Sequence, residues 1–89
     1  MKAIVTVLGM DRVGITAAVT AILAQHDVNI LDITQTILQG YFTMVMLVDT
    51  AACTTPFQDL SRTLAQAGEE QGLSIRIQRE DIFQAMHRI

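Results

Sequence analysis

The sequence is poor in cysteine and in positive charge, and each shortage excludes a class of protein. The single cysteine, Cys53, excludes an intrachain disulfide and a metal site built from several cysteines, and this usage is typical of a cytoplasmic protein. Six basic residues against nine acidic ones give a net charge of -3. The basic residues are scattered, whereas a protein that binds a phosphate backbone shows a basic patch. We therefore expect no direct contact with nucleic acid.

Long hydrophobic runs are also missing. The longest unbroken apolar stretch, residues 44–48, is far shorter than the roughly 18 residues that a membrane span requires. At the N-terminus, a short apolar run after Lys2 is followed by Gly9 and the acidic Asp11, which favours a strand over a signal peptide. We expect no contact with a membrane and a cytoplasmic location.

Apolar residues, in contrast, are abundant. Hydrophobic residues make up 51% of the 89 residues, a length that predicts a single domain over 1–89. A chain of this size buries only about 60–65% of the surface that it exposes when unfolded. The sequence therefore predicts apolar surface that a partner or an additional element must cover.

The apolar pattern alternates between the periods of strands and helices. It predicts strands at residues 2–8, 28–38, 41–48 and 74–79, and helices at residues 14–26 and 56–72. Gln39-Gly40 forms the turn of an antiparallel hairpin, and the second strand is expected to be half-buried. Thr55 is the predicted N-cap of the second helix, with Pro56 at its first position and Gln58 completing a capping box. Gly72 ends that helix, with Gly68 as an earlier alternative.

A short last helix is predicted after Asp81. Its apolar side chains are Ile82, Phe83, Met86 and Ile89. Because about eight residues do not hold a helix in water by themselves, this segment is expected to dock on another surface.

The order β-α-β-β-α-β predicts an α+β, ferredoxin-like sandwich with a four-stranded antiparallel sheet and two helices on one face. The first and third strands are then the inner pair, and both of their faces are largely apolar. We expect the terminal helix, a second copy of the sheet, or both, to cover the open face. The residues predicted to need cover are Val5, Val7, Val45 and Leu47, or their neighbours of opposite parity.

The turn between the first strand and the first helix offers a place for a ligand. Gly9 and Gly14 bracket it, and glycine permits positive φ and close approach of a ligand. The start of a helix presents unpaired N–H groups that suit a carboxylate, and Asp11 suits an ammonium group. A free amino acid carries both groups. In the alternative interpretation, Asp11 only caps the helix and the glycines only shape the turn.

Together, these features resemble the ACT domain, a small amino-acid-sensing regulatory module. The resemblance depends on the segment GMDRVGI at residues 9–15, on Val28-Asn29-Ile30 at the start of the second strand, and on the order of the elements. The ending FQAMHRI at residues 83–89 is similar to an uncharacterised family of small stand-alone ACT proteins of bacteria and archaea. The beginning of the chain is similar to the ACT module of the glycine-cleavage repressor.

The resemblance implies a regulatory, non-catalytic protein that binds a small molecule, with an amino acid as the expected ligand, as a homodimer or higher homo-oligomer. ACT domains commonly bind amino acids where the first β–α loop of one protomer meets the second strand of its neighbour. The implied ligand-binding residues are Asp11, Arg12, Val13, Gly14, Ile15, Asn29, Ile30 and Leu31. Asp11 would hold the amino group, the loop N–H groups the carboxylate, and Asn29 would reach across the interface. A protein partner would be regulated in trans.

Two alternatives stay open: a protein–protein interaction scaffold without a ligand, and an acylphosphatase-like enzyme that uses Arg12 and Asn29. The loop of an acylphosphatase ends in a Phe-Arg pair, whereas this one ends in Val13-Gly14-Ile15. Serine-sensing ACT domains can carry a histidine at the end of the first strand, where this chain has Gly9, so serine is not the favoured ligand. We expect no catalytic residue, no metal and no cofactor, since neither histidine has a second ligand at metal-binding spacing.

Overall fold

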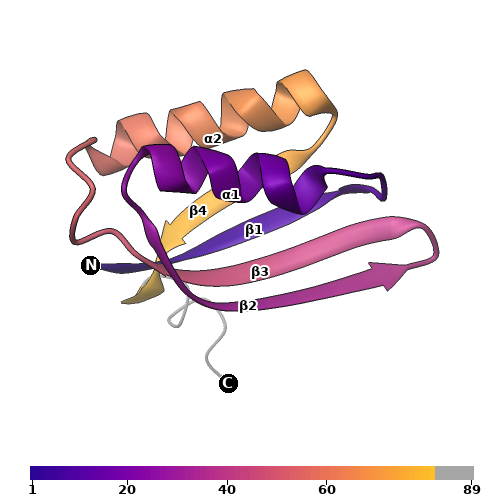
Figure 1. Cartoon of the computed structure of the whole chain (residues 1–89), viewed down its shortest axis with the longest axis horizontal. Coiled ribbons are helices and arrows are strands. Elements are labelled where there is room, and N and C mark those ends of the chain that lie inside the picture. The colour runs from indigo at the N-terminus through magenta and orange to yellow at the C-terminus, as the bar shows by residue number, and fades with distance from the viewer. Residues whose placement is uncertain (82–89) are drawn as a thin grey trace.

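The computed structural model describes residues 1–81, and its elements follow the predicted order (Figure 1). They are β1 (Lys2–Met10), α1 (Ile15–Gln25), β2 (Asn29–Leu38), β3 (Tyr41–Asp49), α2 (Phe57–Gln71) and β4 (Ser74–Arg79). Every boundary lies within two residues of its prediction. The predicted terminal helix of residues 82–89 lies outside the described residues.

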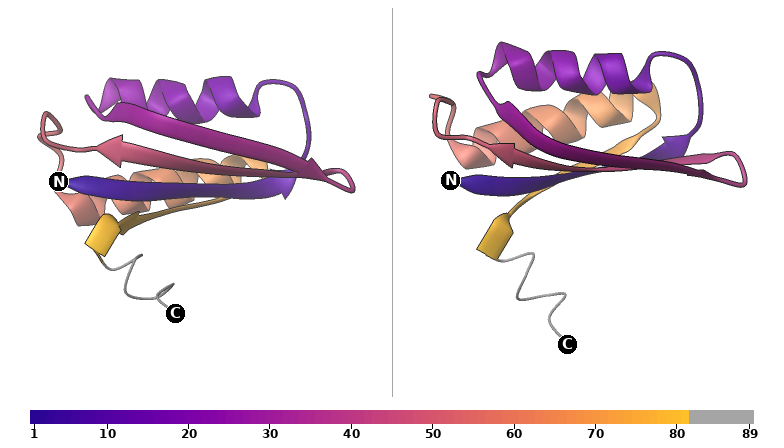
Figure 2. Two further views of the ribbon diagram at one scale, coloured as in Figure 1. Left: turned by 90° about the horizontal axis from the view of Figure 1, so that it is seen from below. Right: turned by 60° about the horizontal axis from the view of Figure 1, so that its bottom comes forward.

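The four strands form one antiparallel sheet in the order β2-β3-β1-β4, so β1 and β3 are the inner pair, as predicted. Both helices lie on the same face of the sheet (Figure 2). This arrangement confirms the ferredoxin-like sandwich.

The hydrophobic core lies between the helices and this sheet face. Alternate residues of the inner strands point into it, because successive side chains of a strand face opposite sides. The buried residues of β1 and β3 are Ala3, Val5, Val7, Phe42, Met44, Met46 and Val48. The helices add Ile15, Val19, Leu23, Leu60 and Leu64, and β4 adds Ile75 and Ile77. Within residues 1–81 no polar or charged side chain is buried, so apolar burial dominates the stability of this core.

The residues on the open sheet face differ from those predicted. Val5 and Val7 are fully buried under the helices, since they pair with Met46 and Met44 of β3. Val45 instead pairs with Thr6, on the face away from the helices. The predicted group therefore mixed the two faces, because strand periodicity alone does not set the register between β1 and β3.

The prediction of a half-buried second strand is wrong. Every residue of β2 except Ile30 is exposed. Ile33 and Ile37 pair with buried Met46 and Phe42, so they face the helix side, yet they remain 42% and 59% exposed. β2 is the outermost strand, and a β-bulge between Ile30 and Asp32 interrupts its pairing with β3. The structure thus leaves a ten-residue edge strand with exposed apolar side chains on it.

The start of α2 also differs from its prediction. Pro56 is the N-cap residue, and no side-chain hydrogen bond caps the helix. The Thr55 hydroxyl lies 3.2 Å from His26 Nδ1 at the end of α1 instead, so the predicted capping box does not form.

At its other end, α2 continues through Gly68 and stops at Gly72, as predicted. The Leu73 N–H donates to the Gly68 backbone carbonyl (2.7 Å), and the Gly72 N–H donates to the Glu69 backbone carbonyl (3.2 Å). With φ of 72° at Gly72, this is a Schellman motif, which turns the chain into β4.

Candidate functional site

The β1–α1 loop, residues 11–14, is held at the hairpin end of the sheet. The Asp11 N–H donates to the Gly40 carbonyl in the β2–β3 turn (2.9 Å). Gly14 has φ of 93° and forms the N-cap of α1, a left-handed conformation that a side chain would strain. Its carbonyl accepts the first intrahelical bond, from Ala18 (2.9 Å). The start of α1 is therefore presented to solvent at a fixed place beside the turn.

The Asp11 carboxylate does not cap α1. Neither a side-chain cap nor an acidic residue in the first turn is found for this helix. The interpretation of Asp11 as a simple helix cap is therefore wrong. Asp11 is exposed in the loop before α1, and its side chain has no role in that cap.

The side chains of Arg12 and Val13 have different surroundings: Arg12 contacts α2, whereas Val13 faces solvent. The Arg12 Nη2 donates to the backbone carbonyl of Gln71 (2.8 Å) and to its Oε1 (3.1 Å), at the last residue of α2. A cation is favourable at a helix C-terminus, so Arg12 links the loop to α2. Val13 is 99% exposed, whereas Ile15 is 1% exposed and belongs to the core. Of the predicted loop residues, Asp11, Val13 and Gly14 thus face solvent, and Ile15 serves packing.

The other predicted site residues, Asn29, Ile30 and Leu31, lie at the opposite end of the sheet. Asn29 pairs with Asp49, which pairs with Lys2 on β1, while the loop follows Met10, which pairs with Tyr41. The eight steps along β3 correspond to roughly 27 Å. One copy of the chain therefore does not bring the two groups of predicted residues together.

The family model described as ACT domain matches residues 2–78. The chain belongs to the ACT domain family. A UPF0237 protein of Clostridium acetobutylicum is 51% identical over the full length of both chains. Among solved structures, an ACT domain protein from Streptococcus pneumoniae has a TM-score of 0.84 and 40% identity, covering 98% of each chain.

A third similar structure is a putative glycine cleavage system transcriptional repressor. It has a TM-score of 0.73 and 25% identity, and the match covers 86% of this chain and 44% of the repressor chain. The resemblance to both groups of ACT proteins is thereby confirmed.

Within this ACT domain, the acylphosphatase-like arrangement does not form. That chemistry would need Arg12 and Asn29 on one anion, but they lie at opposite ends of the sheet and Arg12 is bonded to Gln71. Residues 1–81 also hold no group of three His, Cys, Asp or Glu side chains placed to share a metal ion. No helix in this part of the chain is long and apolar enough to cross a membrane.

The Asn29 end of the ACT domain carries a firmly ionised carboxylate. Asp49 Oδ1 accepts a hydrogen bond from the Ala51 N–H (2.9 Å) and lies 3.6 Å from the N-terminal ammonium. These contacts, the Ala51 bond foremost, hold the pKa of Asp49 below its ordinary value of 3.8. At the end of the sheet where Asn29 lies, an ionised Asp49 therefore lies beside the N-terminal ammonium and Lys2.

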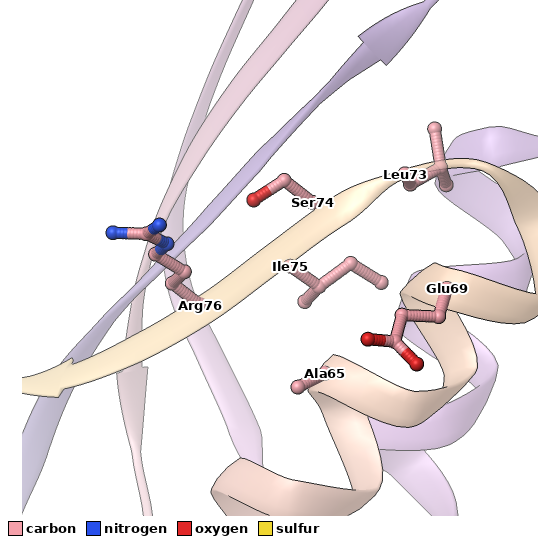
Figure 3. A pocket seen from close by; sticks show the side chains of 6 residues that line it. All are labelled: Ala65, Glu69, Leu73, Ser74, Ile75 and Arg76. Atoms are coloured by element: carbon pink, nitrogen blue, oxygen red, sulfur yellow. The ribbon is translucent and has the colours of Figure 1, made fainter.

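The structure also has a shallow groove that sequence reasoning missed. It lies between α2 and the outer edge of β4 (Figure 3), has a volume of about 250 Å³, and is lined by Ala65, Glu69, Leu73, Ser74, Ile75 and Arg76. Figure 3 shows Glu69 on the α2 side beside Ile75, while Arg76 is directed away from it. Since its charged groups do not converge, we assign it no ligand. The sequence carries no motif that could have indicated it.

Proposed function

We propose that this ACT protein is regulatory and binds an amino acid, or a similar small molecule, at an interface between two copies of the chain. The observation that carries the proposal is the position of Asp11. Asp11 is exposed in the loop that leads into α1, three residues before the N-cap Gly14, and its side chain is not used as a cap there. The helix N–H groups suit the ligand's carboxylate, and Asp11 suits its ammonium group.

A second copy is needed to complete the site. β1 and β2 both run antiparallel to β3, so Asn29 at the start of β2 lies far from the loop of its own copy. If two β2 edges pair antiparallel, the start of one β2 lies beside the end of the other. That end is Leu38, next to Gly40 and hence to Asp11. Asn29, Ile30 and Leu31 of one copy then meet residues 11–15 of its partner.

This arrangement supports a homodimer in which ligand binding and assembly are coupled. A ligand that contacts both copies binds the dimer and not the monomer, so it stabilises the dimer by mass action. We propose further that the dimer regulates the activity of another protein, which it contacts in trans.

A thermal-shift screen of the amino acids at millimolar concentration tests the ligand. At 100 times the dissociation constant, one ligand stabilises the fold by about 2.7 kcal/mol. We expect one amino acid or a small group to raise the melting temperature, and Asp11→Ala to abolish the effect without lowering the melting temperature of the unliganded protein. No shift with any amino acid, on protein shown to be dimeric, would overturn the proposal.

Mixed dimers test whether the site is shared. In a dimer of one Asp11→Ala chain and one Asn29→Ala chain, one site has lost both groups and the other keeps both. We expect half of the sites to bind with native affinity, although neither variant binds alone. If each copy held a complete site, mixing would restore nothing.

A scaffold that recruits another protein is the second candidate. It is favoured by the exposed apolar side chains of the β2 edge, because such an edge can accept a strand from a partner. A purified partner that binds the wild-type chain but not Ile33→Lys, together with a negative amino-acid screen, would support this candidate in place of the first.

A further inference from the structure

The outer edge of β2 presents backbone groups at every second residue. Leu38 pairs with Tyr41 across the two-residue turn, and residues that flank such a turn exchange hydrogen bonds. Because bonded and non-bonded positions alternate along an antiparallel pair, Ile33, Gln35 and Ile37 lie at non-bonded positions. Their N–H and C=O groups therefore point away from β3, toward the free edge of the sheet (Figure 1).

A side-chain contact of Asp32 agrees with this direction of the backbone. The Ile33 N–H donates to Asp32 Oδ1 (2.8 Å), which an N–H at the free edge can do and an N–H bonded to β3 cannot. Charged side chains commonly protect free edges from unwanted pairing. Since this bond is exposed to solvent, a neighbouring strand can replace it with a backbone bond of the same kind.

The side chains of these three edge residues lie on the helix side of the sheet, because each pairs with a buried residue of β3. Ile33 and Ile37 are 42% and 59% exposed, and Gln35 lies between them. The Thr16 hydroxyl donates to Gln35 Oε1 (3.4 Å), while the amide nitrogen of Gln35 has no protein partner within residues 1–81. The edge is therefore apolar, polar and apolar in turn, with Gln35 at the centre.

The regular part of β2 has the same centre. The β-bulge between Ile30 and Asp32 interrupts the strand at one end, and the turn after Leu38 ends it at the other. Residues 32–38 between these two features have Gln35 at their midpoint. In a two-fold dimer each contact occurs twice, so two such edges pair over their full regular length only when the axis passes through Gln35.

We propose that β2 pairs antiparallel with β2 of a second copy, with Gln35 opposite Gln35 on the two-fold axis and Ile33 opposite Ile37 of the partner subunit. This inference rests on the homodimer proposed above and defines its register. Every outward backbone group of the three residues then meets a complementary group, and isoleucine meets isoleucine. A shift by two residues places isoleucine opposite Gln35 and moves the pairing into the bulge or the turn.

This register also defines what a second copy adds to the ligand site. Beyond the bulge, Asn29 comes beside the Gln39-Gly40 turn of the partner subunit. Within each copy the carbonyl of Gly40 accepts a hydrogen bond from the Asp11 N–H (2.9 Å), at the base of the β1–α1 loop. A shift by two residues moves Asn29 about 7 Å along the partner strand. The proposed register therefore brings Asn29 closest to that loop.

Disulfide cross-linking tests the register. Cys53 is the one cysteine of the chain, so Cys53→Ser gives a background without thiols. Opposed residues at a bonded position have Cα atoms about 5.5 Å apart, which a disulfide can bridge. At about 10 μM protein, we expect Gln35→Cys to form a covalent dimer roughly 100-fold faster than Ala65→Cys on exposed α2, because paired thiols have an effective concentration of about millimolar.

A mixed pair keeps the test valid if Gln35→Cys does not dimerise. Ile33→Cys and Ile37→Cys should each fail to cross-link alone, because in this register identical residues lie about 13 Å apart along the paired strands. Refolded together in the same background, the two variants should form a mixed covalent dimer.

The other outcomes separate the register from the homodimer. Fastest cross-linking by Thr34→Cys, by Thr36→Cys or by Ile33→Cys alone would place the axis elsewhere and overturn the register, while the homodimer would stand. Rates no higher than that of Ala65→Cys at all five β2 positions, in a chain that is dimeric by size-exclusion chromatography, would place the interface away from β2 and overturn the inference. A chain that is monomeric at high concentration would overturn the homodimer together with its register.

Discussion

The negative charge of Asp49 stabilises the folded protein, so the free energy of unfolding depends on pH. Its pKa is lowered, mainly by the Ala51 N–H and further by the N-terminal ammonium and Lys2. A lowered pKa in the folded state contributes stability above the ordinary value of 3.8, and this contribution is lost as pH falls through the lowered value. We expect Asp49→Asn to have a lower urea midpoint than wild type at neutral pH, and the gap to close at pH values below 3.8.

A second acidic variant serves as the control for this experiment. Asp59→Asn removes the same charge from an exposed pair with Arg62 (3.4 Å), which should contribute little. A gap between wild type and Asp49→Asn that persists unchanged at low pH would contradict the role of ionisation.

Two residues, Thr55 and Val5, make contacts that the sequence alone did not predict. The preference of Thr for N-caps is real, yet Thr55 contacts His26, 29 positions away in the sequence. Local pattern carries no information on such a contact. In the same way, alternation showed that β1 has two apolar faces, but only the pairing of Val5 with Met46 assigns one face to the core. Both errors concern contacts distant in the sequence.

Helix α2 can approach β4 closely because Gly68 has no side chain. A Cβ at Gly68 would lie 2.7 Å from the Leu73 carbonyl oxygen and 3.1 Å from Ile75 Cγ1. In an open helix, alanine is more favourable than glycine by about 1 kcal/mol. Here the clash with backbone reverses the sign, and we expect Gly68→Ala to destabilise the protein by about 1–3 kcal/mol in urea unfolding.

The matched variant lies on the exposed surface of the same helix. Ala65→Gly should cost only the difference in helix propensity, about 1 kcal/mol. An increase in stability for Gly68→Ala would show that β4 moves away freely, contrary to the tight packing described above.

The elements themselves were predictable where local physics decides them. Gln39 and Gly40 both have positive φ (50° and 84°), as a two-residue hairpin turn of type I′ requires, and strand alternation located β4 to the residue. The exposure of β2 was not predictable from its apolar residues, because it depends on how far the two helices reach over the sheet. The sequence does not show where α1 lies over the sheet or how far the β2 edge extends beyond it.

The exposed β2 edge is the feature from which assembly of the whole molecule is expected. A ten-residue edge strand that carries exposed isoleucines favours strand addition by a second copy. Ile33→Lys places a charge in the middle of this edge, and we expect it to shift the protein from dimer to monomer in size-exclusion chromatography without changing the circular dichroism spectrum. Ala65→Lys, on exposed α2, should remain dimeric. A wild-type chain that is monomeric at high concentration would contradict this expectation.

Local sequence pattern marks only the loop half of the candidate site, whereas Asn29, Ile30 and Leu31 were named through the family resemblance. Gly14 and Asp11 mark the loop because glycine and an acidic residue before a helix have local meaning. That Asn29 lies at the far end follows from topology, since β1 and β2 both run antiparallel to β3. The loop's link to α2 through Arg12 and Gln71 joins positions 59 apart and had no local signal.

The strand order has a consequence for how the chain folds during synthesis. β1 is made first, yet one of its two partners, β4, ends only at residue 79 of 89. Until then the β1 edge has no neighbour on that side, and its pairing depends on contacts between the two ends of the chain. Such non-local pairing is slow, and unpaired apolar edges invite aggregation. The nascent chain is therefore most vulnerable until β4 has left the ribosome.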